Sequence, residues 1–211
     1  MSAKRISLRF SEQMTGFVTL DGAVDYETGF RHGRNDDTRC SVSLVLEVTD
    51  VDAFLRDPDA KAIATGYVDC PKLGARCAVE NGTVNILIDV VHRRHEFKDF
   101  RYHLLFRTTS GRLLTLSGVK FVDDDGVIHI WRDTTTLFTK IFEGDVARGE
   151  EDRATTLAAG VLRLHFFAFF KMLVLVRSEP PTTAAWIMGM WRFLSFFLGS
   201  LWQVYGWSGV R

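Results

Sequence analysis

The sequence predicts a mainly β protein, either an antiparallel β-sandwich or a partly open barrel, with one or two C-terminal helices packed on it. Turn signals such as Asp21-Gly22, Asn81-Gly82 and Ser110-Gly111 recur at short intervals between segments of strand-like pattern. Strands and helices do not alternate along the chain and the GxGxxG pattern is missing, which argues against a dinucleotide-binding domain. The apolar, aromatic-rich C-terminal part supplies the expected helices.

The strand pattern is strongest where apolar and polar residues alternate, because such a strand buries one face. The segment CSVSLVLEV is the clearest case. Between strands, DVDAFLRDPDAKA predicts a short helix or capped loop, with Asp50 or Asp52 as the cap and Pro58 as the stop. The stretch GVIHIWRDTTTLFTKIFEG predicts one long strand or a hairpin. The other expected strands are LRFSEQMTGFVTL, ATGYVDC, TVNILIDV after the Asn81-Gly82 turn, FRYHLLFRT and LLTLSGVKFV.

A charged segment, DVARGEEDRATT, closes this β region. We therefore expect an antiparallel β domain over residues 1–156. Residues 157–211 are expected to form an apolar strand and helix extension packed on the β domain. Within it, Leu162–Val176 predicts a strand leading into a helix, and Pro180-Pro181 separates this part from a last apolar segment.

The last apolar segment, Ala184–Trp207, is long enough to span a bilayer, but Arg192 and several small polar residues argue against a simple span. Three interpretations stay open: a helix packed on the sheet, an interfacial helix whose aromatic side chains enter a membrane, or a contact for a partner protein or lipid. The residues expected to make a membrane or partner contact are Trp186, Trp191, Phe193, Phe196, Trp202 and Trp207.

The charge balance and the cysteine content restrict the expected partners and the expected cellular compartment. The chain has 26 basic and 26 acidic residues, so nucleic acid is not an expected partner. The start lacks the apolar region of a secretory signal peptide, and three cysteines cannot all form disulfides with one another. We therefore expect a cytoplasmic protein, with peripheral membrane association as an open alternative. The oligomeric state is left open.

Catalytic and metal-binding patterns are weak. The histidines of VVHRRHEFKDFRYH, which are His92, His95 and His103, favour a hairpin tip over a metal site. DDDG at residues 123–126 favours a hairpin turn over a calcium loop. The GxSxG elbow is missing, and no nucleophilic set stands out from its competitors. We expect no catalytic residues, no metal and no cofactor.

The segment IWRDTTTLFTK is the best polar candidate. As a strand it would place Trp131, Asp133 and Thr135 on one face and Arg132 on the other. These four residues are the candidate ligand-binding positions. The structural alternative is a polar network inside a sheet, in which Asp133 accepts hydrogen bonds from neighbouring side chains.

Several segments resemble, in matching order, an accessory region of cholesterol-oxidase-like flavoproteins of the glucose–methanol–choline oxidoreductase family. They are LRFSEQMTGFVTLD, WRDTTTLFTKIFEG, AAGVLRL and FFLGSLWQVYG. The resemblance implies a free-standing accessory module without the flavin-binding domain and without the catalytic residues of the flavoproteins. It also implies an association with enzymes that act on sterols or other lipids.

Two functional hypotheses follow. The first is a non-catalytic accessory module that binds a lipid, a sterol, a membrane surface or a lipid-modifying protein. The alternative is an enzyme or enzyme subunit that acts on a lipid or steroid in a pocket between the sheet and the C-terminal helices, where Arg132, Asp133 and the three histidines would be the first polar residues to test.

Overall fold

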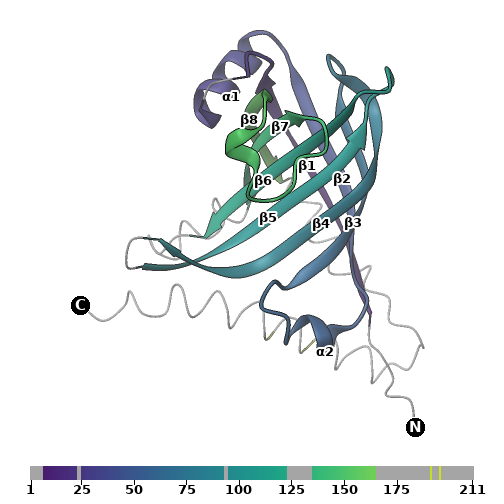
Figure 1. Ribbon diagram of the computed structural model, residues 1–211, viewed down its shortest axis with the longest axis vertical. Coiled ribbons are helices and arrows are strands. Elements are labelled where there is room, and N and C mark those ends of the chain that lie inside the picture. Colours follow the sequence, from purple (N-terminus) through teal and green to yellow (C-terminus); the bar gives the residue numbers. More distant parts are fainter. Residues whose placement is uncertain are drawn as a thin grey trace.

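The chain folds into an antiparallel β-barrel, as the computed structural model shows (Figure 1). The structure describes residues 7–22, 25–92, 95–122 and 135–164 together with Trp191 and Ser195, and of residues 87–92, 95–98 and 122 it describes the backbone alone. The elements within these residues are β1 (Leu8–Thr19), α1 (Tyr26–Asn35), β2 (Arg39–Val48), α2 (Val51–Phe54), β3 (Lys61–Cys70), β4 (Gly74–His92), β5 (His95–Arg107), β6 (Leu113–Val122), β7 (Thr136–Glu143), the 3-10 turn η1 (Glu151–Arg153) and β8 (Thr156–Leu164).

The barrel is closed because β1 pairs on both of its edges. Gly16 of β1 lies opposite Cys40 of β2 on one side and opposite Leu162 of β8 on the other. Every other neighbouring pair follows chain order, so the strands run up and down around the barrel. The prediction of a mainly β fold is confirmed, and of the two expected architectures the barrel is the one found, closed instead of partly open.

The last strand, β8, belongs to the barrel. It pairs with β7 and with β1, so the β domain continues past residue 156 through Leu164. Its consecutive residues from Ala158 to Leu162 are all buried, because the barrel core covers one face and α1 covers the other. The boundary expected at residue 156 came from the charged segment DVARGEEDRATT, which instead forms the connection between β7 and β8 and contains η1.

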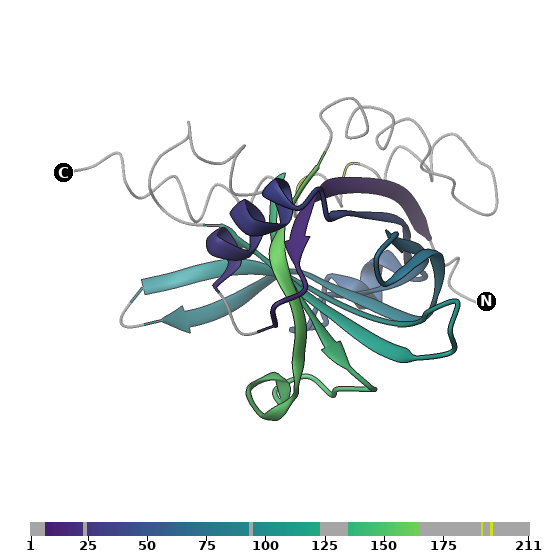
Figure 2. The same cartoon turned by 90° about the horizontal axis from the view of Figure 1, so that it is seen from above.

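Helix α1 was not predicted from the sequence. Asp25 caps it, and the Asp25 Oδ1 accepts a hydrogen bond of 2.9 Å from the Thr28 backbone N–H. Gly29 and Gly33 let the helix lie directly on the barrel wall (Figure 2). A Cβ at Gly29 would lie 2.3 Å from the Ala159 carbonyl oxygen, and one at Gly33 would lie 2.3 Å from that of Val18. The two glycines therefore set the distance between α1 and strands β1 and β8.

The short helix α2 follows the prediction. Asp50 caps it, with the Asp50 Oδ1 accepting from the Ala53 backbone N–H at 3.0 Å. Val51 and Phe54 are buried against the core. Because α1 follows β1 and α2 follows the antiparallel β2, the two helices lie at opposite ends of the barrel (Figure 1).

The predicted turn at Asn81-Gly82 is wrong. Strand β4 runs through both residues without a break, and the pairing with β5 shifts register between Val79 and Asn81, which marks a bulge. A Cβ at Gly82 would lie 2.3 Å from the Ala64 carbonyl oxygen of β3. The glycine thus serves a close approach between two strands and not a reversal of the chain.

The inside of the barrel is apolar except at a few positions. In β1, the inward side chains of Leu8, Phe10 and Met14 are buried, while Arg9, Ser11 and Gln13 point outward and are exposed. Glu12 occupies the inward position between Phe10 and Met14. An acidic side chain at such a position needs a partner within the barrel.

Candidate functional site

A groove lies on the outside of the barrel, between α1 and the strands beside it. Its volume is about 630 Å³, within the range of small-molecule sites. Residues of β1, α1, β2, β3 and β8 line it, so the first and the last strand of the barrel meet there. The groove exists because α1 covers β1 and β8 but leaves part of the neighbouring outer wall uncovered.

A row of polar side chains crosses the groove. Arg163 of β8 lies opposite Thr15 of β1, Thr15 lies opposite Ser41 of β2, and Ser41 lies opposite Asp69 of β3. All four line the groove. The Asp69 carboxylate also accepts a hydrogen bond of 3.1 Å from the backbone N–H of Arg76, which holds it at the edge of the row. The row offers hydroxyl groups between a cation at one end and an anion at the other.

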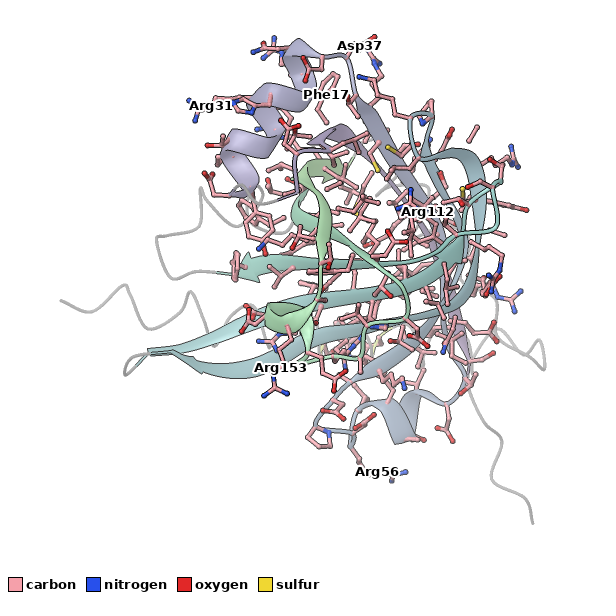
Figure 3. The ribbon with its side chains drawn as sticks, turned by 45° about the horizontal axis from the view of Figure 1, so that its top comes forward. Phe17, Arg31, Asp37, Arg56, Arg112 and Arg153 are labelled. Carbon is pink, nitrogen blue, oxygen red and sulfur yellow. The ribbon has the colours of Figure 1, made fainter. Side chains whose placement is uncertain are left out.

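An aromatic pair with two guanidinium groups forms the other part of the groove. The rings of Phe17 and Phe30 meet edge to face, with centroids 5.8 Å apart. The Arg39 guanidinium carbon lies 5.5 Å from the centroid of Phe17, and that of Arg163 lies 5.3 Å from the centroid of Phe30. Phe17 lies beneath α1 in Figure 3. Arg39 also donates from Nε to Asp37 Oδ1 at 3.4 Å. The other donors of Arg39 and those of Arg163 suit a planar anion such as a carboxylate.

A second polar arrangement lies inside the barrel. The Tyr102 hydroxyl of β5 donates a hydrogen bond of 2.7 Å to Glu12 Oε2, and the Lys120 ammonium of β6 lies 3.4 Å from Glu12 Oε1. Lys120 is 2% exposed and Glu12 is 8% exposed. Strand β1 is not a neighbour of β5 or β6, so these contacts cross the interior and connect opposite walls. We call these three side chains the interior cluster.

Aromatic rings complete the surroundings of the buried cation. The Lys120 ammonium lies 4.9 Å from the ring centroid of Tyr102 and 5.6 Å from that of Phe100. Burial lowers the pKa of Lys120, and the neighbouring Glu12 carboxylate opposes this shift. A buried pair of opposite charges that also has a hydroxyl donor is a self-contained structural network, which fixes the relation of β1 to β5 and β6.

Replacing Tyr102 with phenylalanine should change how stability responds to alkaline pH. Burial first, and then the Glu12 carboxylate, raise the pKa of Tyr102 well above its ordinary value of 10.0. A raised folded-state pKa stabilises the protein below the pKa of the unfolded chain, and this contribution is lost as pH rises above about 10. In urea denaturation at rising pH, the stability advantage of wild type over Tyr102→Phe should therefore shrink above that pH. An advantage that stays constant would contradict the assignment.

No family model, curated protein or solved structure matches this chain. The resemblance to the accessory region of the flavoproteins therefore stays a prediction, and the function has to be argued from the groove and the interior cluster themselves.

Of the four predicted ligand-binding residues, Thr135 lies among the described residues. It is half-buried, has a helical backbone and precedes β7, which begins at Thr136. It lines neither the groove nor the interior cluster. Trp131, Arg132 and Asp133 lie outside the described residues, as does the DDDG stretch at residues 123–126.

Of the six predicted membrane or partner contacts, Trp191 is described. Its backbone is helical and its side chain is 71% exposed. Trp186, Phe193, Phe196, Trp202 and Trp207 lie outside the described residues, and so does most of the expected C-terminal helix. In the part of the chain that the structure covers, no helix has both the length and the apolar character to cross a membrane.

The histidines belong to the barrel wall. His92 and His95 pair at the end of the β4–β5 hairpin, in agreement with the predicted hairpin. His103 Nε2 lies 2.7 Å from the Val146 carbonyl oxygen, a contact that holds the β7–β8 loop on β5. Among the described residues, no three histidine, cysteine or acidic side chains gather as they would around a metal ion.

Neither the groove nor the interior cluster was predicted from the sequence. A signal for the interior cluster was present, because Glu12 interrupts the run of inward apolar residues in LRFSEQM and Lys120 does the same in LSGVKF. The pattern does not show which side chains Glu12 and Lys120 contact. The groove gave no comparable signal, since it depends on a helix that was not predicted and on the pairing of β1 with β8.

Proposed function

We propose that this protein binds an amphiphilic lipid with an acidic head group, of the fatty-acid type, in the groove beside α1. The single observation that carries the proposal is the combination, in a groove of about 630 Å³, of an edge-to-face phenylalanine pair with two arginines stacked on it. The proposal is a more specific form of the lipid-binding accessory module expected from the sequence.

The chemistry of the groove matches the two halves of such a ligand. Phe17 and Phe30 offer apolar surface to a hydrocarbon chain. Arg39 and Arg163 offer planar donors to a carboxylate, and Thr15 and Ser41 add hydroxyl groups next to Arg163. Asp69 also lines the groove and Asp37 pairs with Arg39 at 3.4 Å, so among the described residues Arg163 is the lining cation that forms no ion pair with a carboxylate. A neutral sterol would leave the guanidinium groups unused, so the groove favours an acidic lipid.

Oleate binding to the full-length chain tests the proposal through replacements that remove one charge at a time. Arg39→Gln and Arg163→Gln shorten the side chain modestly and abolish the cation. A hydrogen bond to a charged group contributes about 1.5–3 kcal/mol, so each replacement should weaken oleate binding by about tenfold to a hundredfold. Displacement of a fluorescent fatty acid measures the affinities.

The matched control is Arg56→Gln. Arg56 is exposed and lies at the other end of the molecule from Phe17 (Figure 3). We expect this variant to bind oleate as wild type does, and we expect methyl oleate and cholesterol to bind wild type more weakly than oleate. Equal binding of oleate and its methyl ester, or unchanged binding after both groove replacements, would exclude the proposed site.

Association with a lipid-modifying protein, a membrane surface or a sterol remains a proposal that follows from the sequence resemblance. The enzymatic alternative also stays a prediction, because the pocket that it requires involves the C-terminal segment outside the described residues.

A further inference from the structure

Two of the three cysteines face each other across neighbouring strands. The pairing of β2 with β3 places Val42 opposite Val68 and Ser41 opposite Asp69. One further step in this register places Cys40 opposite Cys70. Both thiols are free and buried, and each shifts the pKa of the other. Opposed residues of an antiparallel pair have Cα atoms about 4.5–5.5 Å apart, a separation that a disulfide can bridge.

The surroundings distinguish the two thiols. Cys70 ends β3 and begins the turn at residues 71–73, where the Leu73 backbone N–H bonds back to the Cys70 carbonyl oxygen at 2.8 Å. The neighbouring Cys40 thiol, together with the backbone N–H groups of Leu73 and Lys72, lowers the pKa of Cys70. The same contact and burial raise the pKa of Cys40 well above its ordinary value. Cys70 is thus the better nucleophile and Cys40 the proton donor.

Cys77 provides an internal comparison. It lies on β4 opposite Val68 instead of opposite a cysteine, and burial raises its pKa. It is buried like the other two thiols. Burial therefore does not distinguish the three cysteines, whereas the strand register does, because it places only Cys40 and Cys70 opposite each other.

We propose that Cys70 and Cys40 form a thiol pair that hydroperoxides oxidise to a disulfide. The Cys70 thiolate attacks one peroxide oxygen, so that an S–O bond forms and the O–O bond breaks. The other oxygen takes a proton and leaves as water or an alcohol. Cys40 then attacks the Cys70 sulfur of the sulfenic acid, the S–S bond forms, the S–O bond breaks, and the oxygen leaves as water. Two thiols are oxidised and one peroxide is reduced.

The disulfide would lie directly below the groove. Arg39 and Ser41, which flank Cys40, line the groove, and so do Asp69 and Pro71, which flank Cys70. The proposed oxidation does not depend on the ligand of the groove, because it involves only the two thiols and the peroxide.

Hydrogen peroxide treatment of the native full-length protein tests the proposal. We expect the intact mass to fall by two hydrogen atoms, peptide mapping to show a Cys40–Cys70 link, and dithiothreitol to reverse the change. Cys77→Ser should form the same link. Cys40→Ser should stop at a Cys70 sulfenic acid that dimedone captures.

Three results would overturn the proposal, all available on the wild-type chain without a variant that has to fold. The first is a native protein that keeps three thiols under peroxide while the urea-unfolded chain loses them. The second is a link that joins Cys77 to either partner in place of the Cys40–Cys70 link. The third is oxidation of Cys77 to a sulfinic acid before Cys70 reacts.

Discussion

Replacing Lys120 with methionine is expected to lower the free energy of unfolding by about 3–5 kcal/mol, because it leaves the Glu12 carboxylate buried without its cation. Methionine nearly matches the volume of lysine, so packing changes little. The Tyr102 hydroxyl, which donates at 2.7 Å, would remain as the partner of Glu12. Urea denaturation measures the loss.

The triple variant Glu12→Leu, Tyr102→Phe, Lys120→Met separates the charge effect from a packing effect, because it removes both charges and the hydroxyl that Glu12 accepts from. Most of the lost stability should return, since apolar side chains replace a buried ion pair at little or no cost. Lys61→Met is the matched control: Lys61 is exposed on β3, and its replacement should change stability by less than about 0.5 kcal/mol. A Lys120→Met variant as stable as this control would show that the interior cluster contributes little.

Replacing Gly33 with alanine is expected to have the second-largest effect. The added methyl group would lie 2.3 Å from the Val18 carbonyl oxygen and 2.4 Å from its carbon, so α1 has to move away from β1. Forced overpacking of this kind costs about 1–3 kcal/mol. The intrinsic helix preference of alanine opposes the loss only weakly. Because Phe30 lies on α1, the displacement should also weaken oleate binding in the groove.

Arg34→Ala is the control on the same helix. Arg34 is exposed, and alanine favours the helix, so stability and oleate binding should stay close to those of wild type. Thermal unfolding and the fluorescent fatty-acid displacement give the two measurements. Unchanged stability of Gly33→Ala would contradict the close contact between α1 and β1.

The strands were largely predictable because their signals are local. Alternation and turn residues are enough to delimit LLTLSGVKFV, which matches β6, and the Asp50 cap predicted α2. The Asn81-Gly82 dipeptide shows the limit of such signals. The same two residues suit a turn or a bulge, and the pairing of β4 with both β3 and β5 decides between them.

Closure of the barrel and the groove were not predictable in this way. Both depend on contacts between β1 and β8, which are far apart in the sequence. The groove also depends on α1, whose glycines lower its helix propensity. Glu12 and Lys120 stood at visibly inward positions, but the sequence does not say which strands face each other across the barrel. The chemistry of the site therefore appeared only with the three-dimensional arrangement.

The pairing of the first strand with the last also determines the order in which this protein can fold. Strands that follow one another from β2 to β6 can pair as soon as both have been synthesised. The second edge of β1 can pair only after β8 has been synthesised. Contacts between such distant segments slow folding, because the chain loses the entropy of closing a long loop before these contacts can stabilise it. During synthesis, β1 thus keeps an open edge that can pair with another molecule until β8 is available.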